Sequence, residues 1–257
     1  MIKALFIDFD GTLYSHATDG VPRSAFDAIT DLRNNGVLVF LCTGRSLPEL
    51  KQFDTGGIIF DGMILSNGQL IFDEHNHVIY DRPIDGILKE ELIRMFNEKA
   101  MPVYVATKDE LYLNYVNDFL VEVQAAISSE VPEVRDYNGE DFYTACVFID
   151  NESARAEVDA LRKHAEVTYW HEGAVDVVPY GVSKASGIDE LLKMYGLDLS
   201  ETMAFGDGEN DVEMLKHCGI AVAMGNSPDF VKEVADFVTD DIDDDGFYKA
   251  LKYYGLL

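Results

Sequence analysis

Short apolar runs alternate with amphipathic stretches near both ends of the chain. The runs consist mainly of apolar residues and do not alternate with polar ones, which favours parallel strands buried on both faces. They are Ala4–Phe9, Val37–Cys42, Thr202–Phe205 and Gly219–Ala223. Stretches with the apolar spacing of helices lie between or after them: Ser24–Asn34, Ser183–Tyr195, Asn210–His217 and Ser227–Ala235. This alternation predicts a doubly wound α/β sheet.

The middle of the chain has more predicted strands than helices. Its strand-like pieces are Val103–Ala106, Leu111–Tyr115, Tyr143–Ile149, Val167–Trp170 and Ala174–Val178. Its helix-like pieces are Leu88–Ala100, Asp118–Ile127 and Glu152–His164. We therefore expect an α+β domain, residues 83–183, inserted into a Rossmann-like core of residues 1–82 and 184–257. Asp81-Arg82-Pro83 and Pro179-Tyr180-Gly181 supply breakers at the two junctions.

The charge balance narrows the range of partners. The chain has 257 residues, 47% of them hydrophobic, and a formal net charge of −27. That charge disfavours nucleic acid and anionic membranes as partners, and a small anionic substrate would need a cation to offset it. Three dispersed cysteines, an apolar start too short for a signal peptide and no long uncharged stretch predict a cytoplasmic protein.

Two aspartates end the first predicted strand, in the segment Asp8-Phe9-Asp10-Gly11-Thr12-Leu13. Residues i and i+2 of a strand face the same way, so Asp8 and Asp10 project together. Ligands of open α/β sheets bind at the carboxyl ends of the strands. Adjacent carboxylates repel each other unless a cation joins them, and Mg²⁺ favours oxygen ligands. The pair is either part of such a site or two solvated turn aspartates.

Three other segments carry polar groups in comparable places. Gly206-Asp207-Gly208-Glu209-Asn210-Asp211 follows another apolar run and adds carboxylates, although an acidic helix N-terminus is an alternative interpretation. Thr43-Gly44-Arg45 follows Val37–Cys42, where a hydroxyl and backbone N–H groups can hold a phosphate. Lys184 opens a predicted helix, where it is either a phosphate-binding ammonium or an ordinary surface lysine.

In this order, the four segments resemble the four motifs of the haloacid dehalogenase superfamily of phosphohydrolases. The first and fourth motifs together are highly specific, and the second and third support them. The α+β insert between the second and third motifs is similar to that of the Cof-type sugar-phosphatase branch, as is Ser66-Asn67-Gly68. The resemblance spans the whole chain and implies a Rossmann-like core with an inserted α+β cap that selects the substrate.

The resemblance also implies a role for each motif residue. Asp8 would be the nucleophile that forms an aspartyl-phosphate, and Asp10 the general acid and then the base. Mg²⁺ would be held by Asp8, the backbone carbonyl of Asp10, Asp207 and Asp211, the last directly or indirectly. Phosphate oxygens would be held by the backbone N–H groups of Phe9 and Gly44 and by the side chains of Thr43, Lys184 and Asn210. The metal would screen the nucleophile from the phosphate, which answers the problem of the net charge.

We therefore expect a Mg²⁺-dependent phosphatase of small phosphorylated metabolites such as sugar phosphates. We expect it to be a monomer or a small homo-oligomer, without a nucleic-acid or membrane partner. One alternative is a phosphomutase of the same superfamily, which would re-deliver the phosphoryl group. Another is a non-catalytic phosphometabolite-binding protein, against which the intact Asp8 and Asp10 pair argues.

Two further segments imitate metal sites. Asp241-Ile242-Asp243-Asp244-Asp245-Gly246 begins like an EF-hand loop, but Lys252 stands where a bidentate glutamate is needed. We interpret it as a turn that leads into a helix at Phe247–Leu251. His75-Asn76-His77 is interpreted as a loop, since two histidines alone rarely bind zinc.

Overall fold

The computed structural model describes residues 1–127 and 129–257 and divides the chain into two compact units. The first unit comprises Met1–Gly44, Phe53–Asp81 and Ser183–Leu257. The second comprises Arg45–Gln52 and Arg82–Val182. Residues 45–52 thus group with a part of the chain that lies far from them in sequence. Within the described residues, no helix has both the length and the apolar character to cross a membrane.

The first unit is built on an eight-stranded sheet in the order β14-β13-β12-β1-β2-β3-β4-β5. Its strands are β1 (Ala4–Asp8), β2 (Leu38–Cys42), β3 (Gly62–Leu65), β4 (Leu70–Asp73), β5 (Val78–Asp81), β12 (Thr202–Gly206), β13 (Ile220–Ala223) and β14 (Phe237–Val238). The six strands from β14 to β3 are parallel, whereas β4 and β5 are antiparallel additions. The α/β class predicted from the pattern is confirmed, but the sheet is mixed at one edge.

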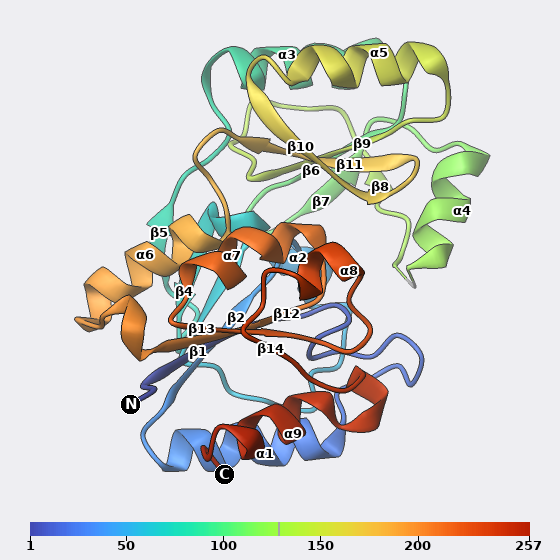
Figure 1. Ribbon diagram of the computed structural model, residues 1–257. Coiled ribbons are helices and arrows are strands. Elements are labelled where there is room, and N and C mark those ends of the chain that lie inside the picture. The colour runs from blue at the N-terminus through green and yellow to red at the C-terminus, as the bar shows by residue number, and fades with distance from the viewer. Residues whose placement is uncertain (128) are drawn as a thin grey trace. The chain divides into compact units, whose positions relative to one another are not determined.

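Helices cover both faces of this sheet (Figure 1). The helices of the unit are α1 (Arg23–Asn34), α6 (Lys184–Tyr195), α7 (Val212–His217), α8 (Asp229–Lys232) and α9 (Gly246–Tyr253). Helices α6 and α7 pack with Phe6 and Phe40 in one buried cluster. On the other face α1 contacts α9, whose Phe247 ring lies 4.6 Å from that of Phe205. Because side chains alternate along each strand, both faces of the central strands are apolar.

Two predicted helices are shorter than expected, for local reasons. The stretch predicted at Asn210–His217 starts with a 3₁₀ turn, Glu209–Asp211, before α7. That turn is held because the Asp211 carboxylate accepts backbone N–H groups upstream, at Asp207 and Gly208. The stretch predicted at Ser227–Ala235 is helical only over α8, because the chain leaves the helix to pair β14 with β13.

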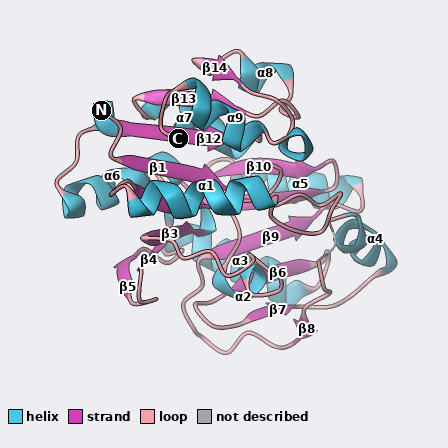
Figure 2. Cartoon of the chain, turned by 90° about the horizontal axis from the view of Figure 1, so that it is seen from below, coloured by secondary structure: helices cyan, strands magenta, loops and turns pink. Residues whose placement is uncertain are grey.

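The second unit has a six-stranded sheet in the order β10-β11-β9-β6-β7-β8. Its strands are β6 (Val103–Ala106), β7 (Leu111–Leu113), β8 (Glu133–Val134), β9 (Thr144–Phe148), β10 (Ala165–His171) and β11 (Ala174–Pro179). Its helices are α2 (Leu47–Leu50), α3 (Gly86–Glu98), α4 (Asp118–Ala126) and α5 (Glu152–Leu161). Figure 2 distinguishes these helices and strands by colour. Residues of α3 and α5 pack on one face of the sheet and residues of α4 on the other.

Candidate active site

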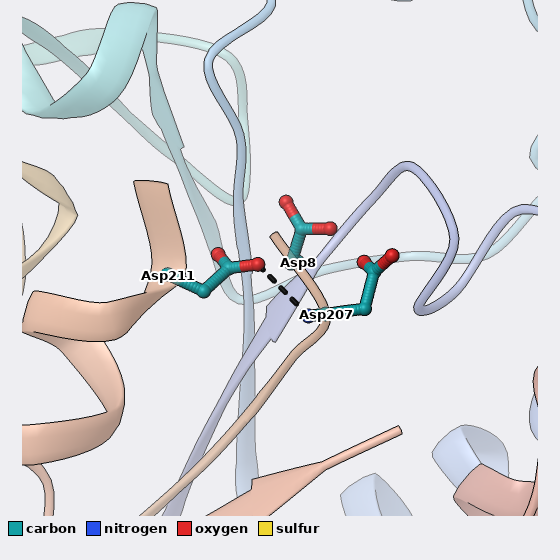
Figure 3. Close-up of side chains that lie close together, drawn as sticks. All are labelled: Asp8, Asp207 and Asp211. Atoms are coloured by element: carbon teal, nitrogen blue, oxygen red, sulfur yellow. Dashed lines mark hydrogen bonds between the residues drawn. The ribbon is translucent and has the colours of Figure 1, made fainter. Parts of the chain in front are cut away.

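Three aspartates converge at the carboxyl ends of two neighbouring parallel strands. Asp8 is the last residue of β1, Asp207 follows β12, and Asp211 ends the 3₁₀ turn that comes next. One carboxylate oxygen from each lies within 4.8 Å of the other two. Figure 3 shows the three side chains gathered around a common point. The pairing of β1 with β12 thus brings together two motifs that are about 200 residues apart in sequence.

Lys184 supplies a positive charge to this carboxylate cluster. It is the first residue of α6, whose N-terminus is capped by the Ser183 side chain. Its side chain is fully buried, and its Nζ donates to Asp8 Oδ1 at 2.5 Å and to Asp211 Oδ1 at 2.6 Å. Because Lys184 is buried, the interpretation of it as a surface residue is wrong. The two paired carboxylates stabilise the buried ammonium.

The protonation equilibria of the cluster reflect its excess of negative charge. Burial, and then repulsion from Asp211, raises the pKa of Asp8 well above its ordinary value, although Lys184 opposes the change. Burial and Asp211 also raise the pKa of Asp207 to about 7. For Lys184, burial lowers the pKa, but Asp211 and Asp8 outweigh it and raise the pKa overall. One lysine therefore leaves the three carboxylates short of positive charge.

The donor set fits a magnesium ion. Its groups are carboxylate oxygens, which are the ligands that hard divalent cations prefer. Burial and repulsion from Asp211 raise the pKa values of Asp8 and Asp207, and an added positive charge would favour the ionised forms of both. Asp211 differs from the others because its Oδ1 accepts from Lys184 and its Oδ2 accepts from two backbone N–H groups.

In the loop after β1, the backbone at Gly11 lies close to the Asp207 side chain. Gly11 has a positive φ of 77°, and a Cβ there would lie 2.3 Å from Asp207 Oδ2. The adjacent Thr12 donates its hydroxyl to Asp207 Oδ1 at 2.9 Å. Asn226, in the loop after β13, donates to the Gly11 carbonyl at 2.8 Å and to Asp207 Oδ2 at 3.2 Å. These contacts orient the Asp207 carboxylate.

A second group of polar residues surrounds Gly44. Thr43 follows β2 and is buried, and its carbonyl accepts the Asn67 N–H at 3.1 Å. The Asn210 side chain donates to Asn67 Oδ1 at 3.3 Å. A Cβ on Gly44 would lie 3.1 Å from that Asn67 oxygen and 3.4 Å from Asn210 Nδ2. Asn67 is buried with a left-handed φ of 54°, an uncommon conformation that places its side chain between the two motifs.

The other predicted residues of the first motif, Asp10 and Phe9, make contacts outside the three-aspartate cluster. The carboxylate of Asp10 is outside the three-aspartate cluster, and its Oδ1 lies 2.8 Å from His16 Nε2. Phe9 is buried and stacks its ring on Tyr14 at 5.0 Å. Strand alternation from Asp8 does not extend to Asp10, because β1 ends at Asp8.

Sequence reasoning alone does not identify several contacts of the site. Thr12 belongs to the first motif, but no spacing assigns its hydroxyl to Asp207. Asn67 belongs to a segment that the family resemblance indicates, but the resemblance does not name its contact with Asn210. His16 and Asn226 carry no pattern that distinguishes them from ordinary loop residues. The contact of His16 depends on how its own loop folds, and that of Asn226 on how distant loops meet.

The acidic segment Asp241–Asp245 is a turn and helix start, as predicted. Its 3₁₀ turn, Ile242–Asp244, precedes α9, and the side chain of Asp241 caps it by accepting the Asp243 N–H. Asp243 and Asp245 accept the hydroxyls of Ser15 and Ser24. His75-Asn76-His77 lies in the turn between β4 and β5, also as predicted.

Comparisons with known proteins match the chain over nearly its full length. The family model described as haloacid dehalogenase-like hydrolase matches residues 5–251. The phosphatase BT1666 from Bacteroides thetaiotaomicron is 34% identical with a TM-score of 0.89, over 100% of this chain and 96% of that one. The subclass IIB sugar phosphatase BT4131 is 31% identical with a TM-score of 0.87, over 99% of this chain and 100% of that one. The 5-amino-6-(5-phospho-D-ribitylamino)uracil phosphatase YcsE of Bacillus subtilis (strain 168) is 28% identical, over 99% of this chain and 98% of its own length.

Proposed function

The chain belongs to the haloacid dehalogenase-like hydrolase family, and we propose that it is a Mg²⁺-dependent phosphatase of small phosphate monoesters. The observation that carries the proposal is the buried Asp8, paired with Lys184 at a strand end beside Asp207 and Asp211. The relatives include a sugar phosphatase and a phosphatase of a ribitylamino-uracil phosphate. We therefore propose phosphate monoesters of sugars or similar small metabolites as the substrate class.

Asp8 is the proposed nucleophile. Its carboxylate attacks phosphorus, an oxygen–phosphorus bond to Asp8 forms, and the bond to the leaving alkoxide breaks. The nucleophile must be ionised, but burial raises its pKa. Lys184 opposes that effect at 2.5 Å and thereby helps to keep Asp8 ionised.

Asp8, Asp207 and the backbone carbonyl of Asp10 are the proposed direct ligands of Mg²⁺. When bound, the ion supplies positive charge that offsets the repulsion between the Asp8 carboxylate and a dianionic phosphate. We propose that Asp211 acts indirectly, because its Oδ1 is paired with Lys184 and its Oδ2 already accepts two backbone N–H groups. Each oxygen of Asp207, by contrast, accepts one hydrogen bond from a neutral side chain, which leaves a lone pair for the metal. Its part is to hold Lys184 and the loop that carries Asp207.

Asp10 is the proposed acid and base. It protonates the leaving alkoxide in the first step and takes a proton from the water that hydrolyses the aspartyl-phosphate in the second. The proposed donors to phosphate oxygens are the backbone N–H groups of Phe9 and Gly44 and the side chains of Thr43, Lys184 and Asn210. The contact of Asn210 with Asn67 supports this grouping, because it ties Asn210 to the Thr43-Gly44 turn.

We further propose that residues 1–82 and 184–257 carry the chemistry and that residues 83–183 determine which substrate is preferred. All the proposed catalytic groups lie within residues 1–82 and 184–257, and none lies within residues 83–183.

A panel of phosphorylated metabolites tests the proposal. The wild-type protein and Asp8→Asn are incubated with each ester and Mg²⁺, and inorganic phosphate and isomeric products are both measured. Phosphate release that disappears in Asp8→Asn is the expected result. Formation of an isomer without phosphate release would instead indicate a phosphomutase. Tight binding of a metabolite without turnover would indicate a binding protein.

A further inference from the structure

We propose that His16 is a positioning residue that orients the Asp10 carboxylate for proton transfer. The inference rests on the proposed function, in which Asp10 handles the proton of the leaving group. His16 Nε2 lies 2.8 Å from Asp10 Oδ1. We assign the donor role to the ring Nε2–H, because Asp10 Oδ1 can accept both when the carboxyl group is ionised and when its acid proton is on Oδ2. This hydrogen bond restricts the Asp10 carboxyl group to one of the many orientations that a partly exposed aspartate can adopt.

The two residues meet because the intervening chain is folded into a compact loop. Gly11 N–H donates to the Tyr14 carbonyl at 3.0 Å, and Tyr14 N–H donates to the Phe9 carbonyl at 2.8 Å. Beyond them, Ser15 and Gly20 exchange backbone hydrogen bonds of 2.9 and 3.1 Å. These closures turn the chain back after Asp10, so that a residue six positions later reaches its side chain.

An aromatic group fixes the imidazole ring. The His16 ring lies edge-on to Tyr14 at 5.4 Å and to Phe53 at 6.1 Å. Phe9 in turn packs against both Tyr14 and Phe53, at 5.0 and 5.7 Å. Tyr14 and Phe9 are buried, so the surface that supports the ring belongs to the core. Such edge-to-face contacts define the orientation of a ring as well as its burial.

A distant segment braces the same loop. Ser15, next to His16, donates its hydroxyl to Asp243 Oδ1 at 2.6 Å. Asp243 is itself held in its 3₁₀ turn by a hydrogen bond from its N–H to Asp241 at 3.0 Å. Within the loop, the Tyr14 hydroxyl donates to Asp19 at 2.7 Å. The acidic segment that imitates an EF-hand therefore serves to hold the loop that presents His16.

This arrangement predicts a defect that depends on the leaving group. Removal of the His16 hydrogen bond leaves the nucleophile and the carboxylate cluster in place, but the Asp10 carboxyl group is then no longer held in one orientation. A sugar alkoxide needs a proton as it departs, whereas p-nitrophenolate needs little help. Proton transfer contributes about 10²- to 10⁴-fold to such steps, so a misdirected acid loses part of that factor. We expect His16→Leu to slow the first step at least about 10-fold with a sugar phosphate and less than about 3-fold with p-nitrophenyl phosphate.

The experiment measures single-turnover release of the leaving group from both esters at saturating enzyme and Mg²⁺. Wild type, His16→Leu, His16→Gln and Asp10→Asn are compared, with His75→Leu as a control in an exposed turn. His16→Gln keeps an N–H donor near the Nε2 position and should recover much of the rate with the sugar phosphate. Ser15→Ala removes the brace to Asp243 without altering His16 and should show the same selective loss in weaker form.

The outcomes separate this inference from the proposed function. A wild-type enzyme without phosphatase activity, or an Asp10→Asn enzyme without selective loss, would overturn the proposed function. A selective loss in Asp10→Asn that is absent in His16→Leu would overturn only the role of His16. Equal losses with both esters in His16→Leu would also overturn it, because they would mean that His16 serves the fold of the loop rather than the acid. Selective loss in His16→Leu with recovery in His16→Gln would support it.

Discussion

Replacement of Lys184 by methionine should destabilise the metal-free protein strongly. Lys184 is fully buried, with its Nζ 2.5 Å from Asp8 and 2.6 Å from Asp211. Methionine keeps the length and the helix propensity of the side chain but removes the charge. The three carboxylates, of which Asp8 and Asp211 are buried and Asp207 half-buried, would then lose the ammonium that pairs with them.

The magnitude follows from these distances. At an effective dielectric constant of about 20, each contact of the ammonium is worth about 6 kcal/mol of attraction. The cost of removing the ammonium from water offsets much of that sum, and deletion of one partner of a buried pair typically costs about 3–5 kcal/mol. We expect a loss in this range in the free energy of unfolding at pH 8.

The loss should depend on pH in a definite direction. Lys184 lowers the pKa of Asp8, so its removal raises that pKa further. A carboxyl group whose pKa is higher in the folded than in the unfolded state binds its proton more tightly in the folded state. The free energy of unfolding therefore falls as pH rises above the pKa that the group has in the unfolded state. The deficit of Lys184→Met should therefore shrink at pH 5, and added Mg²⁺ should restore part of it at pH 8.

Urea unfolding in EDTA, at pH 5 and pH 8, measures these differences. Lys193→Met is the matched control on the same helix, because Lys193 is exposed and pairs with Glu190 at the surface. The control should leave the unfolding midpoint nearly unchanged. A Lys184→Met protein within about 1 kcal/mol of wild type at pH 8, where loss of a buried partner costs several times more, would refute the electrostatic reasoning.

Activity should require Mg²⁺, and Ca²⁺ should be a poor substitute because it takes longer bonds and more ligands. Phosphate release is measured after chelation and again after addition of each metal, and full activity in excess chelator would contradict the prediction. The free energy of unfolding of the metal-free protein should fall as pH rises from about 4 to about 7, because the pKa of Asp207 is raised to about 7 in the folded state. Asp207 alone contributes a slope of up to about 1.4 kcal/mol per pH unit. Unfolding measured in EDTA should therefore show a smaller slope for Asp207→Asn than for wild type. Gly11→Ala should reduce kcat by about 10-fold or more, because a Cβ would lie 2.3 Å from Asp207 Oδ2 and the residue has a left-handed φ. Steady-state kinetics at saturating Mg²⁺ measures this change, and an unchanged kcat would mean that the loop relaxes freely.

The central strands and the convergence of motifs were predictable because both follow from simple physical rules. Strands buried on both faces consist mainly of apolar residues, and this is true of β2 and β13 and of β1 up to Ile7. Parallel strands end at the same edge of a sheet, so the polar residues after β1 and β12 had to lie together. The family resemblance added the roles, and the family match over residues 5–251 confirms that resemblance.

The parts that were not predicted depend on contacts between distant segments. The antiparallel strands β4 and β5 extend the sheet beyond what the alternation of strands and helices indicated. Residues 45–52 group with the second unit, where Tyr104 donates to Glu49 at 2.9 Å. The contact of Asn226 exists because separate loops fold against one another, and that of His16 because its own loop turns back toward Asp10. No periodicity or local motif reports such contacts, since each residue alone has the composition of an ordinary loop.

The central claim is that Asp8 carries the phosphoryl group, and trapping the phosphoenzyme tests it most directly. Asp10→Asn still has the nucleophile but lacks the base for the second step. After incubation with ³²P-labelled p-nitrophenyl phosphate and Mg²⁺, it should retain an acid-stable, hydroxylamine-labile label on the peptide that contains Asp8. The Asp8→Asn, Asp10→Asn double variant should retain none. A label that persists in the double variant or maps to another residue, or rapid turnover by Asp8→Asn without any label, would contradict the account.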